Sequence, residues 1–190
     1  YGGNTSNNGK LDLNSSRSDG TNPKTLTLIN SDGNMAIPDS QKLNFGDGAD
    51  LQIYHDGSSS YIDEVGTGSL KIQTNGTGVD IQKGSSETIA RFIADGEVQL
   101  YHDNHKSFQT HGEGIRVNGP EGTSADIHLY ADKGDDNADK WKISSDTSGN
   151  LSINNYTSGS WETNLKTTGN GAVELYYDNV KKLETASDKI

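Results

Sequence analysis

The chain of 190 residues contains no cysteine, only three prolines and one methionine. Without cysteine, neither disulfide bonds nor thiolate metal sites can contribute to its stability. Hydrophobic residues make up only 29% of the chain, and no apolar run approaches the roughly 18 residues needed to span a membrane. We therefore expect no membrane insertion.

Positive charge is also scarce. The 16 Lys and Arg residues are outnumbered by 27 Asp and Glu residues, which gives a net charge of −11. Proteins that bind nucleic acids or anionic membranes do so through clusters of Lys and Arg. The sequence contains no such cluster, so nucleic acid is not expected as a partner.

The shortage of hydrophobic side chains limits how far one copy of the chain can stabilise itself. Less than a third of the residues can offset the conformational entropy of folding by apolar burial. Small repetitive β units with this shortage bury their apolar faces by stacking or by oligomerising. The composition therefore predicts that part of the burial comes from other copies of the chain.

What the sequence does contain is one short phrase repeated four times. Each copy has two aliphatic residues separated by a polar residue, then a tyrosine, and an aspartate two positions later. This alternation is typical of a two-faced β-strand that runs into a turn. The copies occupy residues 51–56, 98–103, 127–132 and 173–178.

The aliphatic residues of each phrase fall on one face of the predicted strand. We expect this face to form the core and the contacts between copies of the chain. The residues concerned are Leu51, Ile53, Val98, Leu100, Ile127, Leu129, Val173 and Leu175.

The rest of the chain is consistent with an all-β, elongated and repetitive fold, and no segment has a convincing helical pattern. Aspartate followed by Asn or Gly after the phrases predicts tight turns, because these residues cap the backbone and tolerate positive φ. Return strands are expected at 60–62, 106–108, 140–144 and 181–184. Further strands are expected at 25–30, 70–74, 79–82, 89–93, 114–117, 151–154 and 161–166, and residues 42–45 lead into the turn before the first phrase.

These patterns predict two parts. Residues 1–24, rich in Gly, Asn and Ser, are expected to form an irregular leading segment or linker. Residues 25–190 are expected to form the repetitive β region. Its sub-repeats are placed at about 43–97, 98–125, 126–172 and 173–190. Because the first residue is Tyr1 rather than Met, the chain is expected to be a fragment or a processed product.

The tyrosine of each phrase lies on the face opposite the aliphatic pair, beside Gln52, Gln99, His128 or Glu174. One interpretation is that the rings pack on a neighbouring chain or sheet with wet hydroxyl groups. The other is an exposed aromatic row that stacks on sugar rings. The candidate glycan contacts are Tyr54, Tyr101 and Tyr176.

A calcium site is a weaker possibility in the sequence. Asp135, Asn137 and Asp139 alternate as oxygen ligands do in a calcium loop, and Asp146 stands at the twelfth place. Lys140 stands where such loops need glycine, which favours a solvated acidic turn instead. A transition-metal site on the axis of a trimer is the second possibility, with the ligands drawn from His55, His102, His105, His111 and His128.

Catalysis is not expected. Glycan-cleaving enzymes use paired carboxylates, but most acidic residues here stand in Asp-Gly, Asp-Asn or Gly-Asp turns, where backbone capping explains them. No nucleophile motif or phosphate-binding loop is present, and no cofactor is expected.

Three longer phrases resemble those of marine, cyanophage-like bacteriophage tail-fibre and related virion proteins. The likeness extends from about residue 25 to the end of the chain, and the matching phrases are residues 43–57, 134–141 and 171–182. The resemblance implies an intertwined, homotrimeric β fibre. Such fibres are often followed by a C-terminal tip or a self-cleaving chaperone. It leaves three architectures open: a β-prism, a triple β-helix or a string of small β domains.

The resemblance implies a structural component of a tail fibre or similar virion appendage, outside the host cell. Its partners would be other virion tail proteins and a host cell-surface glycan or protein. Two alternatives stay open: a carbohydrate-binding adhesin module on a cell surface, and a glycan-degrading, tailspike-like enzyme.

Overall fold

The structure is a computed structural model that describes residues 33–187. Within this range the chain folds into β-strands, joined by turns and two short 3-10 segments, with no α-helix. The predicted all-β class is therefore confirmed. The strand expected at 25–30 lies outside the described residues. The chain divides into two units between residues 72 and 73, and the sheets are described one at a time.

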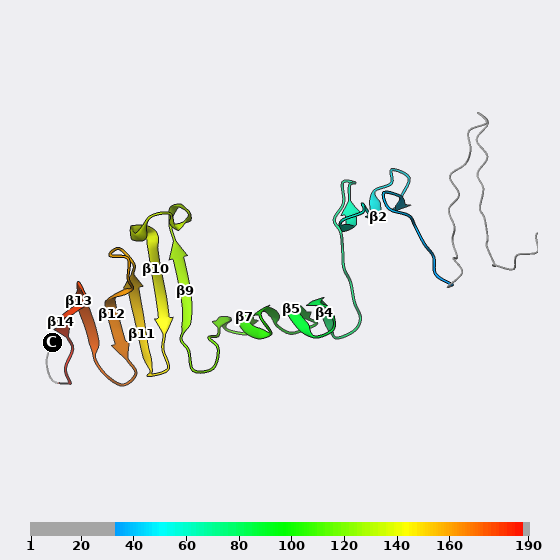
Figure 1. The fold of residues 1–190 in the computed structure, drawn as a ribbon. Helices are drawn as coiled ribbons and strands as arrows, with labels where there is room; N and C mark the ends of the chain where they lie inside the picture. Colours follow the sequence, from blue (N-terminus) through cyan, green and yellow to red (C-terminus); the bar gives the residue numbers. More distant parts are fainter. Residues whose placement is uncertain (1–32, 188–190) are drawn as a thin grey trace, which may run out of the picture. The chain divides into compact units, whose positions relative to one another are not determined.

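The first unit contains a three-stranded antiparallel sheet in which each strand pairs with the next along the chain (Figure 1). Its central strand is the first tyrosine phrase. The strands are β1 (Lys42–Phe45), β2 (Leu51–His55) and β3 (Ser60–Glu64).

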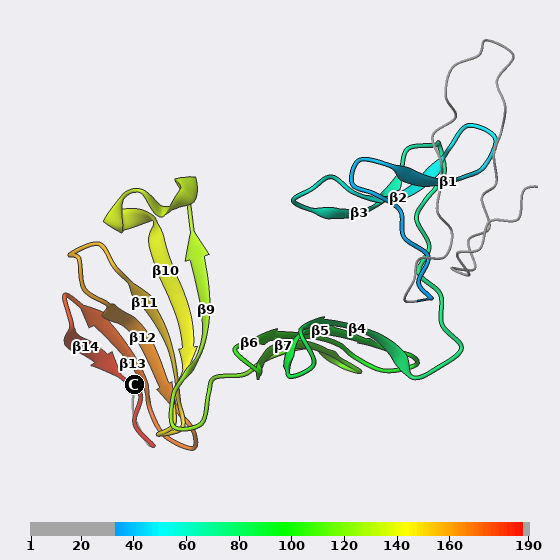
Figure 2. The same ribbon diagram turned by 45° about the vertical axis from the view of Figure 1, so that its right-hand side comes forward.

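The second unit contains two further sheets with the same simple up-and-down topology (Figures 1 and 2). The five-stranded sheet consists of β4 (Gly78–Lys83), β5 (Glu87–Ile93), β6 (Val98–His102), β7 (His105–His111) and β8 (Gly114–Val117). The six-stranded sheet consists of β9 (Ala125–Tyr130), β10 (Lys140–Ser145), β11 (Asn150–Asn155), β12 (Glu162–Thr168), β13 (Val173–Tyr177) and β14 (Val180–Glu184). The 3-10 segments η1 (Asp132–Gly134) and η2 (Asn137–Asp139) join β9 to β10.

All four tyrosine phrases form strands, as predicted, and so do the return strands that follow them. The strands expected at 79–82, 89–93, 114–117, 151–154 and 161–166 are also confirmed, with small shifts at their ends. The strand expected at 70–74 is wrong: this segment has no regular structure, and Ile72 is exposed. Its alternating pattern is not matched by a hydrogen-bonding partner strand, and a β-strand needs one.

Three of the four phrases form a central strand, so they do not begin a structural unit. The phrase strands β2, β6 and β13 each pair with a strand on both sides. The sub-repeat boundaries placed at residues 98 and 173 therefore fall between paired strands of one sheet.

Two of the phrases end in nearly identical turns. Asp103 and Asn104 between β6 and β7 both have positive φ, and so do Asp178 and Asn179 between β13 and β14. Positive φ at both central residues is the mark of a tight hairpin turn that matches the twist of the strands. In each turn the asparagine Oδ1 also accepts a hydrogen bond from a backbone N–H one strand further away. The donors are Thr88, at 2.9 Å from Asn104, and Thr163, at 3.0 Å from Asn179.

These turns belong to a three-stranded module that occurs twice with a constant offset of 75 residues. The module comprises β5–β7 in one sheet and β12–β14 in the other, so that Val98 corresponds to Val173. Both valine N–H groups donate to a threonine hydroxyl, Thr110 in one module and Thr185 in the other. In both modules the register shifts just before the tyrosine, where the return strand has one extra residue, Ser107 in β7 and Lys182 in β14. The repeat therefore extends to individual hydrogen bonds.

The asparagine turn generates a first prediction. Asn179→Ala loses the hydrogen bond to Thr163 and places an alanine at positive φ, so we expect the free energy of unfolding to fall by about 2 kcal/mol. Asn179→Gly loses only the hydrogen bond and should cost about 1 kcal/mol. Chemical denaturation of the two variants measures the difference. If both variants lost the same free energy of unfolding, the positive φ of residue 179 would not constrain which residue can stand there.

Candidate functional site: the apolar face of each sheet

An unbroken row of aliphatic residues crosses the six-stranded sheet. The register of the strands places one such residue from every strand directly opposite the next. Side chains at directly opposed positions share one face of a sheet and contact each other. The row consists of Ile127, Ile143, Ile153, Leu165, Leu175 and Leu183.

The other two sheets have equivalent rows, and we refer to all three as the apolar rows. Each again takes one apolar residue from every strand of its sheet. The row of the five-stranded sheet is Ile81, Ala90, Leu100, Phe108 and Val117. The row of the three-stranded sheet is Leu43, Ile53 and Ile62.

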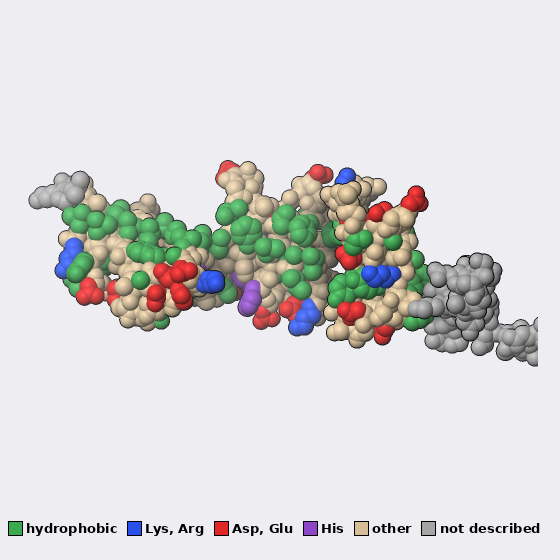
Figure 3. Space-filling model, turned by 90° about the horizontal axis from the view of Figure 1, so that it is seen from above, with side chains coloured by type: hydrophobic (Ala, Val, Ile, Leu, Met, Phe, Trp, Pro, Cys, Tyr) green, Lys and Arg blue, Asp and Glu red, His purple; other side chains and the backbone are tan. Residues whose placement is uncertain are grey.

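The apolar rows are largely uncovered. Leu100 is 44% exposed and Leu175 is 40% exposed, although both lie in the middle of a sheet. The only buried hydrophobic residue among residues 33–187 is Ala90, at 5% exposure. Hydrophobic side chains accordingly lie open on the surface in the space-filling view (Figure 3). Each sheet therefore presents its apolar row without an apolar layer of its own to cover it.

The aliphatic residues of the four phrases lie on these faces, as the alternation predicts. Leu51 and Val98 are half-buried. The others are exposed: Ile53, Leu100, Ile127, Leu129, Val173 and Leu175. Sequence reasoning thus identified the face, and the single chain leaves that face open.

The opposite faces are polar and, unexpectedly, contain most of the buried side chains. In the five-stranded sheet Asp80, Arg91, Gln99, Gln109 and Arg116 are directly opposed across all five strands. Gln99 and Gln109 in the middle of this row are buried, as are Ser144 and Asn154 on the polar face of the six-stranded sheet. Buried polar groups need partners, and hydrogen bonds within these faces supply most of them. The Nδ2 group of Asn154, for example, donates to Ser152 Oγ at 2.9 Å, whereas Gln109 Oε1 is buried without a hydrogen-bond partner.

The phrase tyrosines lie on the polar faces, beside the residues that the alternation predicts. The Tyr101 hydroxyl donates to Gln99 Oε1, and the Tyr176 hydroxyl donates to Glu174 Oε2, both at 2.6 Å. Tyr54 stacks on Tyr61 with ring centroids 4.7 Å apart. All three rings are half-buried and engaged within their own sheets. Glycan contact by these three tyrosines stays a prediction.

Glu174 is the electrostatic centre of the polar face of the six-stranded sheet. Its side chain is only 12% exposed and lies 3.0 Å from Lys181 Nζ and 3.5 Å from Lys166 Nζ. Hydrogen bonds from the Tyr176 hydroxyl and from the Lys181 ammonium lower the pKa of Glu174 from its ordinary 4.5 to about 2. The carboxylate is therefore charged throughout the physiological range and links β13 to both of its neighbours, β12 through Lys166 and β14 through Lys181.

The acidic loop between β9 and β10 gathers a slightly different set from the one predicted. Asp135, Asp136 and Asp139 place one carboxylate oxygen each within 4.8 Å of one another. Asn137 instead lies near Lys140, with Oδ1 and Nζ 3.5 Å apart. Asp146 caps the next turn by accepting two backbone N–H groups and does not join the cluster. The residues that the structure gathers are thus three aspartates of a surface turn, and calcium binding by Asp135, Asn137 and Asp139 stays a prediction.

The five histidines are distributed over all three sheets. His55 ends β2, His102 and His105 face each other across the β6–β7 turn, His111 ends β7, and His128 lies in β9. Within one chain, no three metal-ligating residues that include a histidine come together among residues 33–187. A shared histidine site on a trimer axis stays a prediction.

A scan against protein-family models, curated proteins and solved structures finds no match to this chain. In the part of the chain that the structure describes, no helix is long and apolar enough to cross a membrane.

The low pKa of Glu174 generates a second prediction. Because the folded pKa lies below the unfolded value, the carboxylate stabilises the fold fully above pH 4.5 and progressively less as the pH falls toward 2. We expect Glu174→Gln to flatten the loss of stability between about pH 5 and pH 2, measured as the denaturation midpoint at each pH.

The chain itself provides the control for this experiment. Gln99 occupies the equivalent position of the other module and accepts the same tyrosine hydrogen bond, so Glu174→Gln removes the charge while an acceptor for Tyr176 is retained. Identical acid profiles for the parent and the variant would contradict a stabilising role for the charge.

Proposed function

We propose that this chain is a segment of a tail fibre or similar virion appendage, in which three copies form a β shaft for host attachment. The observation that carries the proposal is the set of apolar rows, which cross every strand of all three sheets and stay uncovered in the single chain. The resemblance of the tyrosine phrases to those of phage tail fibres supports the same assignment.

The exposed area of the apolar rows favours assembly. Removing apolar surface from water returns about 25 cal/mol per Å², or about 1.5–3 kcal/mol for a large aliphatic side chain that becomes fully buried. Side chains that are already half-covered return less each, but fourteen residues form the three rows. Exposed apolar patches that are contiguous over several strands mark interaction sites in soluble proteins.

A second copy of the same chain is the partner that suits these rows best. Every sheet offers the same kind of surface, apolar and uncharged along the row, so equivalent sheets of several copies can cover one another. In a three-fold assembly the contacts are heterologous, and closure of the ring lets each copy cover part of the next. With three copies around one axis, all apolar rows face inward and the polar faces, with their charges, face water.

The role of such a shaft is mechanical. It would carry a host-recognition element away from the virion, outside the host cell, in contact with other virion tail proteins. Weak contacts repeated on three chains add up to a useful avidity for a cell-surface glycan or protein.

The mass of the native particle tests the proposal directly. We expect sedimentation equilibrium or native mass spectrometry of the full chain to give three times the mass of one copy. A cooperatively melting monomer at micromolar concentration would contradict the shaft. A particle of two copies would retain the burial of the apolar rows but would contradict the trimer.

A substitution within an apolar row tests which face is buried. Leu100→Asp places a carboxylate at the centre of the row of the five-stranded sheet, where assembly would bury it without a partner at a cost of several kcal/mol. We expect this variant to be monomeric or aggregated at concentrations at which the parent is trimeric.

Gln82→Asp is the matched control, since it adds the same charge to an exposed position on the polar face of that sheet. We expect Gln82→Asp to assemble normally. Trimers of the Leu100→Asp variant with the parent's stability would show that the apolar row is not the interface.

A further inference from the structure

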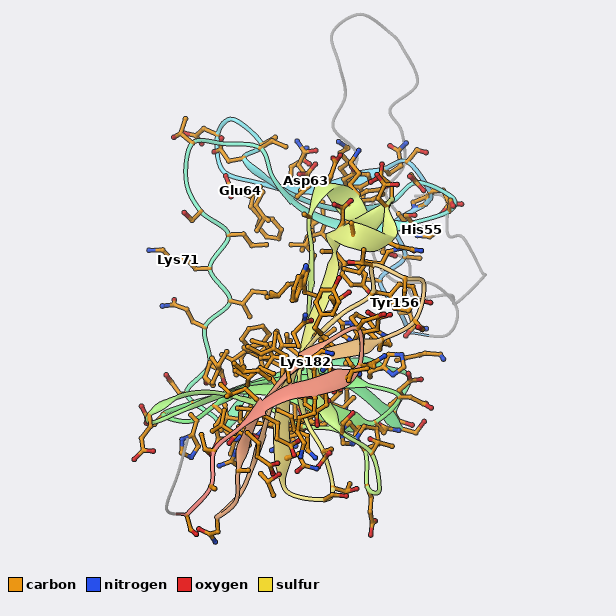
Figure 4. The ribbon with its side chains drawn as sticks, turned by 90° about the vertical axis from the view of Figure 1, so that its left-hand side faces the viewer. His55, Asp63, Glu64, Lys71, Tyr156 and Lys182 are labelled. Carbon is orange, nitrogen blue, oxygen red and sulfur yellow. The ribbon has the colours of Figure 1, made fainter. Side chains whose placement is uncertain are left out.

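One end of the six-stranded sheet carries an aromatic pocket that the tyrosine phrases alone do not reveal. Tyr130 at the end of β9, Lys140 at the start of β10, and Tyr156 and Trp161 in the β11–β12 connection line an open pocket of about 310 Å³. Tyr156 is labelled in Figure 4. A volume of this order is at the lower end of the range for small-molecule sites.

Backbone hydrogen bonds fix the segments that carry the rings. The Tyr156 N–H donates to the Lys140 carbonyl at 3.0 Å, and the Gly159 N–H donates to the Tyr156 carbonyl at 2.9 Å. The Tyr156 and Trp161 rings meet edge to face with centroids 5.1 Å apart. His128 contacts the same tryptophan from β9, at 5.5 Å. The pocket is therefore built within a single sheet of one chain.

The chemistry of the lining selects the class of ligand. Aromatic rings with one wet side suit a ligand that has an apolar face and polar edges. A cationic ligand is disfavoured because lysines of the chain already lie over these rings: Lys142 Nζ is 5.1 Å from the centroid of Trp161, and Lys140 Nζ is 5.8 Å from that of Tyr156. Lys142 is also paired with Asp126 at 3.0 Å. Lys140 lines the pocket itself and can donate hydrogen bonds to a ligand.

We propose that this pocket binds a pyranose ring of a glycan. The C–H face of the sugar stacks on the aromatic side chains, and the Lys140 ammonium donates to a ring hydroxyl. The site differs from the sequence-based candidates Tyr54, Tyr101 and Tyr176, whose rings are engaged within their own sheets. It goes beyond the proposed shaft and does not depend on it, because every lining residue belongs to the same chain.

The two tryptophans make the pocket measurable in the full-length chain. Trp161 lines the pocket, whereas Trp141 is opposite Leu129 on the apolar side of the same sheet. In a Trp141→Phe background Trp161 is the sole tryptophan and reports on the pocket by its fluorescence. The probes are the methyl pyranosides of glucose, galactose and mannose, together with N-acetylglucosamine. We expect a saturable change of emission with at least one of them, with a Kd of the order of millimolar.

Variants in the same background localise the binding. Tyr156→Ala should weaken it about three- to tenfold, which is what the loss of one aromatic contact is worth. Tyr156→Phe retains the ring and should bind like the parent. Tyr54→Ala, which removes a sequence-based candidate, should also leave the affinity unchanged. Circular dichroism of each variant verifies that the β-structure is retained.

Three results would overturn the proposal. The first is a folded Trp141→Phe protein whose emission does not saturate with any pyranoside. The second is a response to choline without a response to sugars, which would indicate a cation site. The third is sugar binding by Tyr156→Ala with the same affinity as the parent. Sedimentation of the same samples separates this inference from the shaft, since a monomer that binds sugar would contradict the trimer alone.

Discussion

The alternation of side chains along the β-strands is the constraint on which the rest of this structure depends. Successive residues point to opposite faces, so the repeated aliphatic–polar–aliphatic pattern gives every sheet one apolar and one polar face. In most antiparallel proteins the apolar face is covered by a second layer of the same chain. Here residues 33–187 bury only one hydrophobic side chain, Ala90. The apolar rows are thus exposed surface in the single chain, and the proposed trimer is the arrangement that would cover them.

The polar faces explain how a single layer keeps its shape. Most of their Gln, Asn, Ser and charged residues are hydrogen-bonded within the sheet, and central members such as Gln99, Ser144 and Asn154 are buried. Glu174 joins a tyrosine and two lysines on adjacent strands. Since apolar burial within one chain is so limited, these polar networks carry an unusually large share of the stability of each sheet.

Much of the fold could be predicted from the sequence because period-2 alternation and Asp-Asn turns are local signals. The four phrases, the turns at Asn104 and Asn179 and the face of the aliphatic residues were all predictable from them. Which strands pair is decided by partners elsewhere, and this explains why residues 70–74 were misassigned. The two modules are 75 residues apart in the sequence, but this repeat is hard to recognise because the spacings between the four phrase tyrosines are uneven. The pocket of Tyr156 and Trp161 could not be predicted, since it depends on which strand ends meet. The buried Gln99 and Gln109 follow no local pattern either.

The up-and-down topology has a consequence for the order of events in folding. Each strand pairs only with its neighbours along the chain, and the connections are turns of a few residues or short loops. Contact order is therefore low for a β protein, and little loop-closure entropy has to be overcome before a hairpin forms. Individual sheets can form early in folding and independently of one another. In the proposed trimer, the association of separate chains would then be the slow, concentration-dependent step, and it would take place between surfaces that are already formed.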